Sequence, residues 1–360
     1  MKKLFFFAIA VLGMTAACQK QGTEGSEIDD NSPVAVQFNV SAPTLTVTKT
    51  KAPVEDWNGE TVFVYGYKKG ADFSNTSDPD IFLIDGISGT ISTGDPASIA
   101  FDNSYYYKGT NVYNFNAYYI DDAQAENAVK NAASITKVIT ITGTQDVMVA
   151  TTTPTDDIPE GKESEVNESR IYSAYAARRG VHPTLNFQHM LTRFNFSIKK
   201  GESTNTDTRK VYVNSIDVKS PNSLTLTVAP TPSITTAQTS TNYASLNVEF
   251  PSGAKRIEPG DDVATDAGNI MIYPDLAEIT INLGLTDDDG TYTETMPITL
   301  KASDVIKDGS NANITKFAAS AQYDIEITVY DLEKVTISAT LGVWEDGGDM
   351  AYDPDEYWPE

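Results

Sequence analysis

The sequence is poor in the residues on which most catalytic and metal chemistry depends. Its 360 residues include one cysteine, Cys18, and two histidines, His182 and His189. A single cysteine excludes an intramolecular disulfide and a CxxC metal or redox pair. Neither histidine lies in an HExxH or HxH pattern, and the chain has no GxSxG elbow, GxGxxG loop or P-loop. We therefore expect a protein that is not an enzyme and that holds neither a metal ion nor a cofactor.

Basic residues are heavily outnumbered. The chain has 26 Lys and Arg residues against 50 Asp and Glu residues, for a net charge of −24. This charge argues against nucleic acid as a partner, because phosphates are bound through Lys and Arg that displace counterions. The acidic runs Asp261–Asp262 and Asp287–Asp289 lack the EF-hand spacing and are interpreted as solvated loops. Paired carboxylates for glycoside hydrolysis stay a less favoured alternative, because no pattern marks a pair.

The one cysteine follows an export signal. Lys2 and Lys3 precede an apolar run, Leu4–Met14, that is too short to cross the roughly 30 Å hydrocarbon core of a bilayer. Small residues then lead to Ala17 and Cys18, where we predict signal cleavage. The pattern resembles a bacterial lipobox, in which the thiol after the cut is acylated.

These features predict a lipoprotein of the cell outer membrane. Residues 1–17 are the signal peptide, and Cys18 begins the mature chain and carries the lipid, palmitate included. Acyl chains contribute ~0.8 kcal/mol per buried methylene, so two or three of them hold a protein on a membrane durably. Residues 18–32 are polar and acidic and are interpreted as a lipidated tether. The alternative is a plain secretory peptide with an incidental cysteine.

Hydrophobic and polar residues alternate almost everywhere after the tether. Short alternating runs of Val, Ile, Thr and Tyr, broken by Gly, Pro, Asn and Asp, are typical of strands half-buried in antiparallel sheets. Residues 285–295, with Asp289 and Gly290 between two such runs, predict a hairpin. A helical pattern is confined to about Asp122–Ala133 and Ser164–Ala177. The predicted fold class is therefore all-β, and the length fits two antiparallel β-sandwiches in tandem.

A change in composition divides the chain. The polar stretch 151–169 precedes the next well-defined strand block at Thr184, which places a join near residue 180. The predicted domains are an N-terminal β-sandwich over residues 33–180 and a C-terminal β-sandwich with an acidic tail over residues 181–360.

The richest aromatic segment is FDNSYYYKGTNVYNFNAYY, residues 101–119. Its alternating aromatic residues are interpreted as sandwich core, and the alternative is a sugar-stacking platform on the outer face. His189 alternates with Phe187 and Leu191, so it is interpreted as a core residue bonded to backbone rather than as a ligand.

Four stretches taken together resemble the fimbrillin-like lipoproteins, the type V pilins of Bacteroidetes and their relatives. They are YNFNAYY (113–119), TQDVMVATTTP (144–154), LNFQHMLTRFNFSI (185–198) and YDIEITVYDLEKVTISATLGVWEDG (323–347). The last of them contains Trp344, where the family's closing strand pair ends. With the lipobox, the resemblance extends over the whole chain.

The resemblance implies transthyretin-like β-sandwiches, display on the cell surface, and either assembly with other fimbrillin-like subunits into a fimbrium or a part in cell adhesion. In the family, a trypsin-like protease can cut after the first strand, and a strand from a neighbouring subunit then fills the vacated groove. The residues matching the released or exchanged strand are Val34, Val36, Phe38 and Val40. The possible sites of proteolytic maturation are Lys49 and Lys51.

A donor strand must alternate and be able to swing free. The residues with that period near the C-terminus are Val335, Ile337, Ala339, Leu341 and Val343. The favoured hypothesis is thus a non-catalytic pilus subunit or adhesin that assembles by strand exchange. The alternative is a glycan-binding outer-membrane lipoprotein, which needs solvent-facing aromatics around a concave site. The receptor, and a stalk, anchor or tip position, do not follow from the sequence.

Overall fold

The protein is built almost entirely from β-strands. The computed structural model describes residues 32–41, 57–75, 77–92, 97–121, 128–202, 210–307, 310–311, 314–331 and 335–342. Within these ranges the one α-helix is α1 (Ala174–Ala177), and the short 3-10 helices are η1 (Ser240–Asn242), η2 (Pro251–Gly253) and η3 (Ala302–Asp304). The predicted all-β fold class is confirmed. The division into two tandem transthyretin-like sandwiches stays a prediction.

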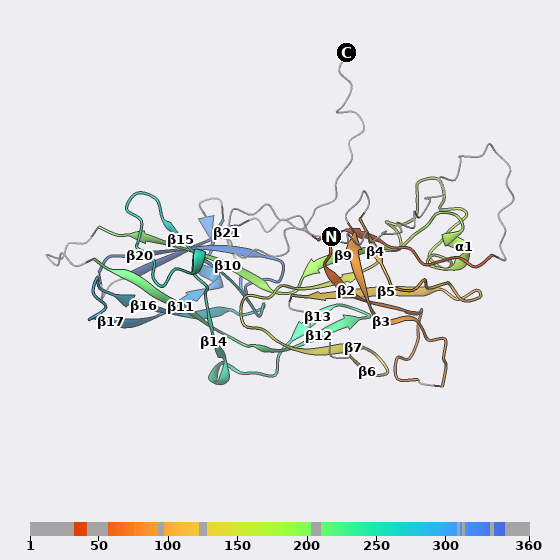
Figure 1. Cartoon of the computed structure of the whole chain (residues 1–360), viewed down its shortest axis with the longest axis horizontal. Coiled ribbons are helices and arrows are strands. Elements are labelled where there is room, and N and C mark those ends of the chain that lie inside the picture. The colour runs from red at the N-terminus through yellow and green to blue at the C-terminus, as the bar shows by residue number, and fades with distance from the viewer. Residues whose placement is uncertain are drawn as a thin grey trace, which may run out of the picture. The chain divides into compact units, whose positions relative to one another are not determined.

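Seven strands form a sheet that closes on itself, which we call the closed sheet. In order around it they are β1 (Asn39–Ser41), β4 (Ala97–Ala100), β3 (Phe82–Ser92), β2 (Thr61–Lys68), β5 (Tyr113–Ile120), β8 (Val147–Thr151) and β9 (Thr184–His189). Neighbouring strands are antiparallel, except that β1 and β9 are parallel. Figure 1 shows β2, β3, β4, β5 and β9 gathered together.

The remaining strands form three open sheets (Figure 1). The six-stranded sheet has the order β15 (Thr265–Ile272), β10 (Thr192–Lys200), β20 (Gln322–Val329), β21 (Val335–Gly342), β18 (Ile306–Lys307) and β19 (Ser310–Asn311). The β11–β16 sheet has the order β14 (Ala244–Asn247), β11 (Tyr212–Ser220), β16 (Glu278–Thr286) and β17 (Thr293–Lys301). The β7–β12 sheet has the order β13 (Ser233–Thr235), β12 (Ser223–Ala229), β7 (Ile135–Thr140) and β6 (Val129–Lys130).

Two of the four sheets, the closed sheet and the β7–β12 sheet, contain strands from both sides of residue 180. Strand β9 follows that position, yet it pairs with β1 and β8 of the closed sheet. Strand β12 pairs with β7 from Ser223↔Thr140 to Ala229↔Ile135. The domain ranges 33–180 and 181–360 stay a prediction, and these ladders tie the two ranges together.

The period-two pattern of the sequence accounts for the strands. Along β20, QYDIEITV, every second residue is buried. The inward side chains are at most 2 % exposed, and they are Tyr323, Ile325, Ile327 and Val329. Because successive side chains of a strand point to opposite faces, such a run buries its apolar face and leaves its polar face outward.

Turn residues place the hairpin between β16 and β17. The two strands pair along their full length, from Glu278↔Lys301 to Thr286↔Thr293. Gly290 has φ +73° in the connecting turn, a left-handed conformation that glycine adopts without a Cβ clash. The predicted hairpin is therefore confirmed.

The described parts of the two expected helices are mostly not helical. In Asp122–Ala133, residues 122–127 lie outside the described residues, and β6 occupies the place where a helix was expected, so that prediction is wrong there. The cause is local turn chemistry, because the Asn131 side chain accepts hydrogen bonds from the N–H groups of Ala133 and Ser134 at 3.1 and 3.0 Å and so returns the chain from β6 to β7. Of the second helical pattern only α1 is helical.

Buried side chains form two hydrophobic clusters. The first includes Val62 and Val64 of β2 together with Phe115 of β5. The second contains Tyr65 and Tyr67 of the same strand β2, with residues from the three open sheets. Strand β2 is thus buried on both faces, and its two sets of alternating side chains belong to different cores.

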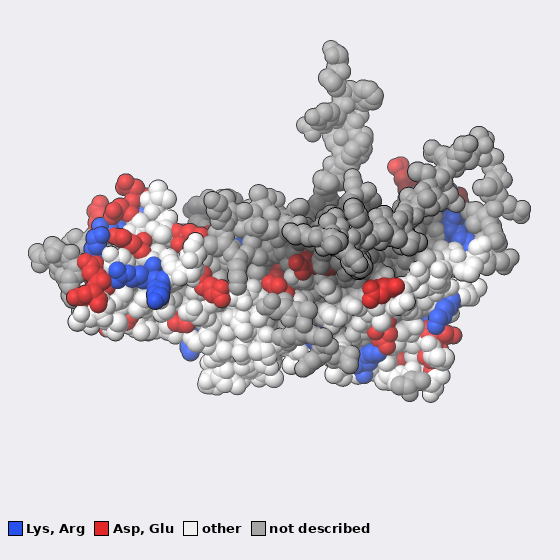
Figure 2. Space-filling model, in the orientation of Figure 1, with Lys and Arg blue, Asp and Glu red and all other residues white. Residues whose placement is uncertain are grey.

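Charge is unevenly distributed over the surface. Residues 220–248 include β12, β13, η1 and β14 and contain no Asp, Glu, Lys or Arg. Figure 2 shows a broad area without charged side chains near β14, with acidic and basic groups at either side of it. A neutral area on a chain of net charge −24 is a place where another acidic molecule is repelled least.

Candidate functional site

Residues 34–41 run along the closed sheet and end in β1. Their side chains alternate as the sequence predicts, with Val36, Phe38 and Val40 only 9, 3 and 7 % exposed. Val34 is half-buried, and the residues between these four are exposed or half-buried. Burying three such apolar side chains stabilises the fold by roughly 5–9 kcal/mol, which is an upper bound because unfolded chains already bury some surface.

Phe38 is the centre of this contact. Its ring centroid lies 5.0 Å from that of Phe115 and 6.0 Å from that of Phe101, both edge-to-face. Such pairs contribute about 0.5–1.5 kcal/mol beyond the burial of their area. Phe115 is itself fully buried and contacts Tyr172. The first strand therefore inserts an aromatic side chain into the first cluster.

Main-chain hydrogen bonds hold the segment on both sides. The Val36 N–H donates to the carbonyl of Tyr105 at 2.7 Å, and the Asn39 N–H donates to that of Pro183 at 3.0 Å. Strand β1 then pairs with β4 through two residues and with β9 through three. Among the described strands, only β1 joins β4 to β9. Without β1, a slot with two unpaired strand edges would lie between them.

A half-buried carboxyl fixes the β9 side of this slot. Asp157 Oδ2 accepts hydrogen bonds from the Thr184 N–H, at 2.9 Å, and from the Tyr172 hydroxyl. Thr184 is the β9 residue opposite Asn39 of β1. Burial raises the pKa of Asp157 above its ordinary 3.8, although the hydrogen bonds from Thr184 and Tyr172 act in the opposite direction. Sequence reasoning missed Asp157, because one aspartate in a polar loop carries no signal.

The aromatic segment 101–119 lies mostly in the core. Tyr107, Tyr118 and Tyr119 are 7, 2 and 3 % exposed, whereas Tyr106 is 48 % exposed. A sugar-stacking platform needs several adjacent exposed rings, and among these tyrosines Tyr106 alone is exposed. The interpretation as core accounts for the segment better.

His189 is buried, as predicted, and one of its partners is a carboxylate that the prediction did not include. Its Nδ1 lies 3.0 and 2.9 Å from the two carboxylate oxygens of Asp146, which is also buried. The Ser320 hydroxyl donates to the His189 carbonyl at 2.6 Å. The histidine thus joins β8 and β9 to the segment before β20, a structural role that alternation alone does not reveal.

The proposed donor residues lie in β21. Ala339 is 1 % exposed, while Val335, Ile337 and Leu341 are half-buried, and Val343 lies outside the described residues. Strand β21 pairs with β20 along its whole length, but with β18 only through Thr340. Within the described chain, one edge of β21 is therefore open over most of its length.

The other predicted site residues cannot be placed. Ala17, Cys18, Lys49 and Lys51 all lie outside the described residues. Across the ranges that are described, no helix has both the length and the apolar character needed to cross a membrane. In the same ranges no three or more His, Cys, Asp or Glu side chains are grouped as a metal ion would require.

The fold and this site define an all-β protein in which the first strand bridges two strands that no other described strand connects. The chain belongs to the fimbrillin-like family, whose sequence model matches residues 50–344. The first strand precedes the matched range. None of the curated proteins matches the chain.

Several solved structures are similar to the chain at low identity. A candidate cell adhesion protein from Bacteroides uniformis is 15 % identical, with a TM-score of 0.48 over 88 % of this chain and 100 % of that one. A fimbrial protein from Bacteroides vulgatus is 14 % identical, with a TM-score of 0.48 over 86 % and 99 %. The fimbrial anchor protein Mfa2 from Porphyromonas gingivalis is 10 % identical, with a TM-score of 0.35 over 88 % and 99 %. The family assignment rests on the match over residues 50–344.

Proposed function

We propose that this protein is a non-catalytic fimbrial subunit or adhesin, anchored by lipid on Cys18 at the surface of the outer membrane, and that its subunits assemble by strand exchange. Membership in the fimbrillin-like family supports the fimbrial role. The observation that carries strand exchange is the position of β1, which alone among the described strands joins β4 to β9.

Cleavage after the first strand would remove its covalent link to the rest of the subunit without removing any non-covalent contact. A cut at Lys49 or Lys51 leaves residues 34–41 attached by their hydrogen bonds and by the burial of Phe38 and its neighbours. Once the strand departs, the slot exposes two strand edges and the apolar surface around Phe115, a combination that proteins seldom leave uncovered. Another extended strand then binds by β-augmentation, in which main-chain hydrogen bonds supply affinity and alternate side chains supply register.

Strand β21 of a neighbouring subunit is the proposed donor. Within the described part of its own subunit it pairs fully with β20 and with β18 only at Thr340, so one of its edges is largely unpaired there. In the slot it would lie between β4 and β9, and both of its edges would pair. To be transferred, β21 must first separate from β20. Exchange is therefore slow, and it is slower still when the slot of the receiving subunit is occupied.

Limited proteolysis tests this proposal. The mature protein is treated with trypsin, the protease is inhibited, and the products are run on SDS gels without heating and then after boiling. We expect a ladder of oligomers that boiling collapses, because exchanged strands resist SDS until the sheet unfolds.

The matched control is the Lys49→Ala/Lys51→Ala double variant, which keeps every other trypsin site. It should stay monomeric under the same treatment. A wild-type protein that is cut at Lys49 or Lys51 yet keeps its own residues 34–41 bound, and forms no oligomer, would show that strand exchange is not how this protein assembles.

A further inference from the structure

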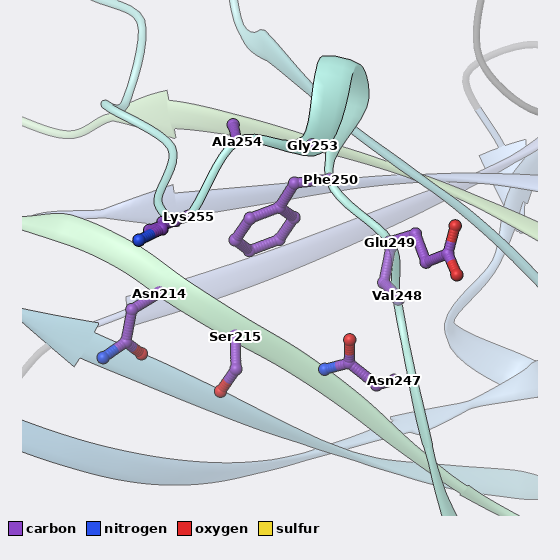
Figure 3. Close-up of a pocket in the computed structure, with 9 residues that line it drawn as sticks. All are labelled: Asn214, Ser215, Asn247, Val248, Glu249, Phe250, Gly253, Ala254 and Lys255. Carbon is purple, nitrogen blue, oxygen red and sulfur yellow. The ribbon is translucent and has the colours of Figure 1, made fainter.

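A hollow of about 440 Å³ lies at the edge of the β11–β16 sheet, far along the chain from the first strand. Strand β14 runs beside β11, and the Val248 N–H still donates to the Ile216 carbonyl at 2.9 Å. The chain then leaves β11 and returns at Ile257, which exchanges hydrogen bonds of 2.7 and 2.9 Å with Val213. Residues 249–256 therefore form an arch beside β11, and the hollow lies between the arch and the strand (Figure 3).

The floor of the hollow is polar because β11 contains a bulge. The register with β16 shifts between Val213 and Ser215, so Asn214 is the extra residue of the bulge. Figure 3 shows the Asn214 and Ser215 side chains pointing to the same side of β11, whereas a regular strand would direct them to opposite sides. Gly284 lies opposite them on β16, and a Cβ there would collide with Asn214 Oδ1 and Ser215 Oγ.

The arch supplies an aromatic ring and a cation. Figure 3 shows the Phe250 ring facing the space between the arch and β11, with Lys255 on the returning limb of the arch. The ring is half-buried because part of it packs against the second hydrophobic cluster, and the rest lines the hollow. Ser252 has φ +56° and Gly253 φ +68°, so the apex holds two left-handed residues in succession. A non-glycine residue in that region is strained by about 1–3 kcal/mol, and such strain gathers at binding sites.

The polar groups of the floor have no internal use. Within the described part of the chain, neither Asn214 nor Ser215 makes a side-chain hydrogen bond, and Lys255 makes no ion pair. Asn247 at the rim donates from its amide to Asp217 at 3.2 Å, which orients that amide. Amides and a hydroxyl beside an aromatic face match a pyranose ring, which carries hydroxyl groups at its edge and apolar C–H groups on its face. The volume lies within the range of small-ligand sites.

We propose that this hollow binds a pyranose sugar unit, with the ring face against Phe250 and hydroxyl groups on Asn214, Ser215 and Asn247. A polyphosphate ligand does not fit, because Lys255 is the one cation among the described residues that line the hollow, and the carboxylate of Glu249 lies there too. The inference does not rest on strand exchange, since the arch and the slot of β1 are built from different strands. It adds a ligand class to the adhesin role.

Saturation-transfer NMR on the mature protein tests the inference. The probes are the methyl pyranosides of glucose, galactose, mannose and N-acetylglucosamine, together with glucuronate, and inositol is the non-pyranose control. We expect transfer to at least one pyranoside and none to inositol. In Phe250→Ala and in the Asn214→Ala/Ser215→Ala double variant we expect the affinity to fall about tenfold or more, the scale of losing one well-placed contact.

Two further variants make the outcome specific to a sugar. Phe250→Trp should retain binding, because a larger aromatic face replaces the lost one, and Tyr106→Ala should bind like wild type. The Tyr106→Ala and Asn214→Ala/Ser215→Ala variants should unfold at the same temperature as wild type, since those side chains are exposed or half-buried. Phe250 also packs against the second hydrophobic cluster, so its variants are compared below their own unfolding temperatures. The proposal is overturned by absence of transfer from every pyranoside, by wild-type affinity in the Phe250→Ala and double variants, or by loss of binding in Tyr106→Ala instead. None of these results bears on the trypsin experiment.

Discussion

At the scale of single residues, the half-buried carboxyl of Asp157 loses part of its hydration but holds a strand in place. The loss of hydration raises its pKa. The hydrogen bonds from Thr184 and Tyr172 offset part of that cost and hold the start of β9 in line with β1. The aspartate thus positions the β9 edge of the slot, and because its pKa is raised, it lowers the stability of the fold at neutral pH.

The pH dependence of stability should report this arrangement. Because folding raises the Asp157 pKa, the folded state binds the proton more tightly, so its favourable contribution is complete below pH 3.8 and is lost as the pH rises through the raised value. Asp157→Asn removes this titration. Urea unfolding from about pH 7 to about pH 4 should therefore show wild type gaining stability relative to the variant as the pH falls through that window.

The exposed Glu160 in the same loop is the matched control, and Glu160→Gln should follow wild type across the series. Asp156 is unsuitable as a control, because its charge contributes to the raised pKa of Asp157. If the difference between wild type and Asp157→Asn were the same at every pH, the carboxyl would not be titrating differently in the folded state.

At the scale of elements, the first strand should behave as a separable ligand. A chain beginning at residue 42 lacks β1, and a fluorescent peptide of residues 32–42 should bind it, with anisotropy as the measurement. Replacing Phe38 with alanine in the peptide should weaken binding by about a hundredfold or more, because large-to-small changes in a packed core cost about 3–5 kcal/mol. The Gln37→Ala peptide should bind like the original, since that side chain is exposed.

Equal binding of the Phe38→Ala and original peptides would mean that the slot binds the peptide through main-chain hydrogen bonds alone, with no contribution from side-chain packing. If the shortened chain does not fold alone, recovery of its β-sheet circular dichroism on adding the peptide replaces anisotropy as the readout.

How far the sequence predicts this molecule depends on the range over which a signal acts. Alternation over a few residues identifies strands such as Tyr323–Val329 and the buried side chains of residues 34–40, of which only Asn39 and Val40 lie in β1. Turn chemistry predicts the hairpin at Gly290. The pairing of Asn39 with Thr184 has no local signal, because it joins residues far apart in the chain and is decided by packing. The bulge at Asn214 is likewise invisible to alternation, which is why the hollow was not predicted.

At the scale of the whole molecule, net charge should control the rate of assembly. Each precursor chain carries −24, so two cut subunits repel one another before their strands can meet. Raising the salt concentration from about 0.1 M to about 1 M shortens the screening length from about 10 Å to about 3 Å. Subunits that are first cut and then freed of trypsin should therefore form oligomers faster as salt rises, which light scattering follows over time.

A rate that falls with salt would instead mean that opposite charges on two subunits guide their encounter. Sucrose at matched viscosity is the control, because it slows diffusion without screening charge.

The ladders that cross residue 180 have a mechanical meaning. Strand β9 bonds to β1 and β8, and β12 bonds to β7, so the portions of the chain before and after the intervening segment interlock through three separate ladders. A single cleavage anywhere in residues 152–183 would break the backbone but leave the two portions of the subunit bound to each other. If the subunits assemble as proposed, tension between them would be borne by these sheets, and cleavage by a protease in that segment would not release half a subunit.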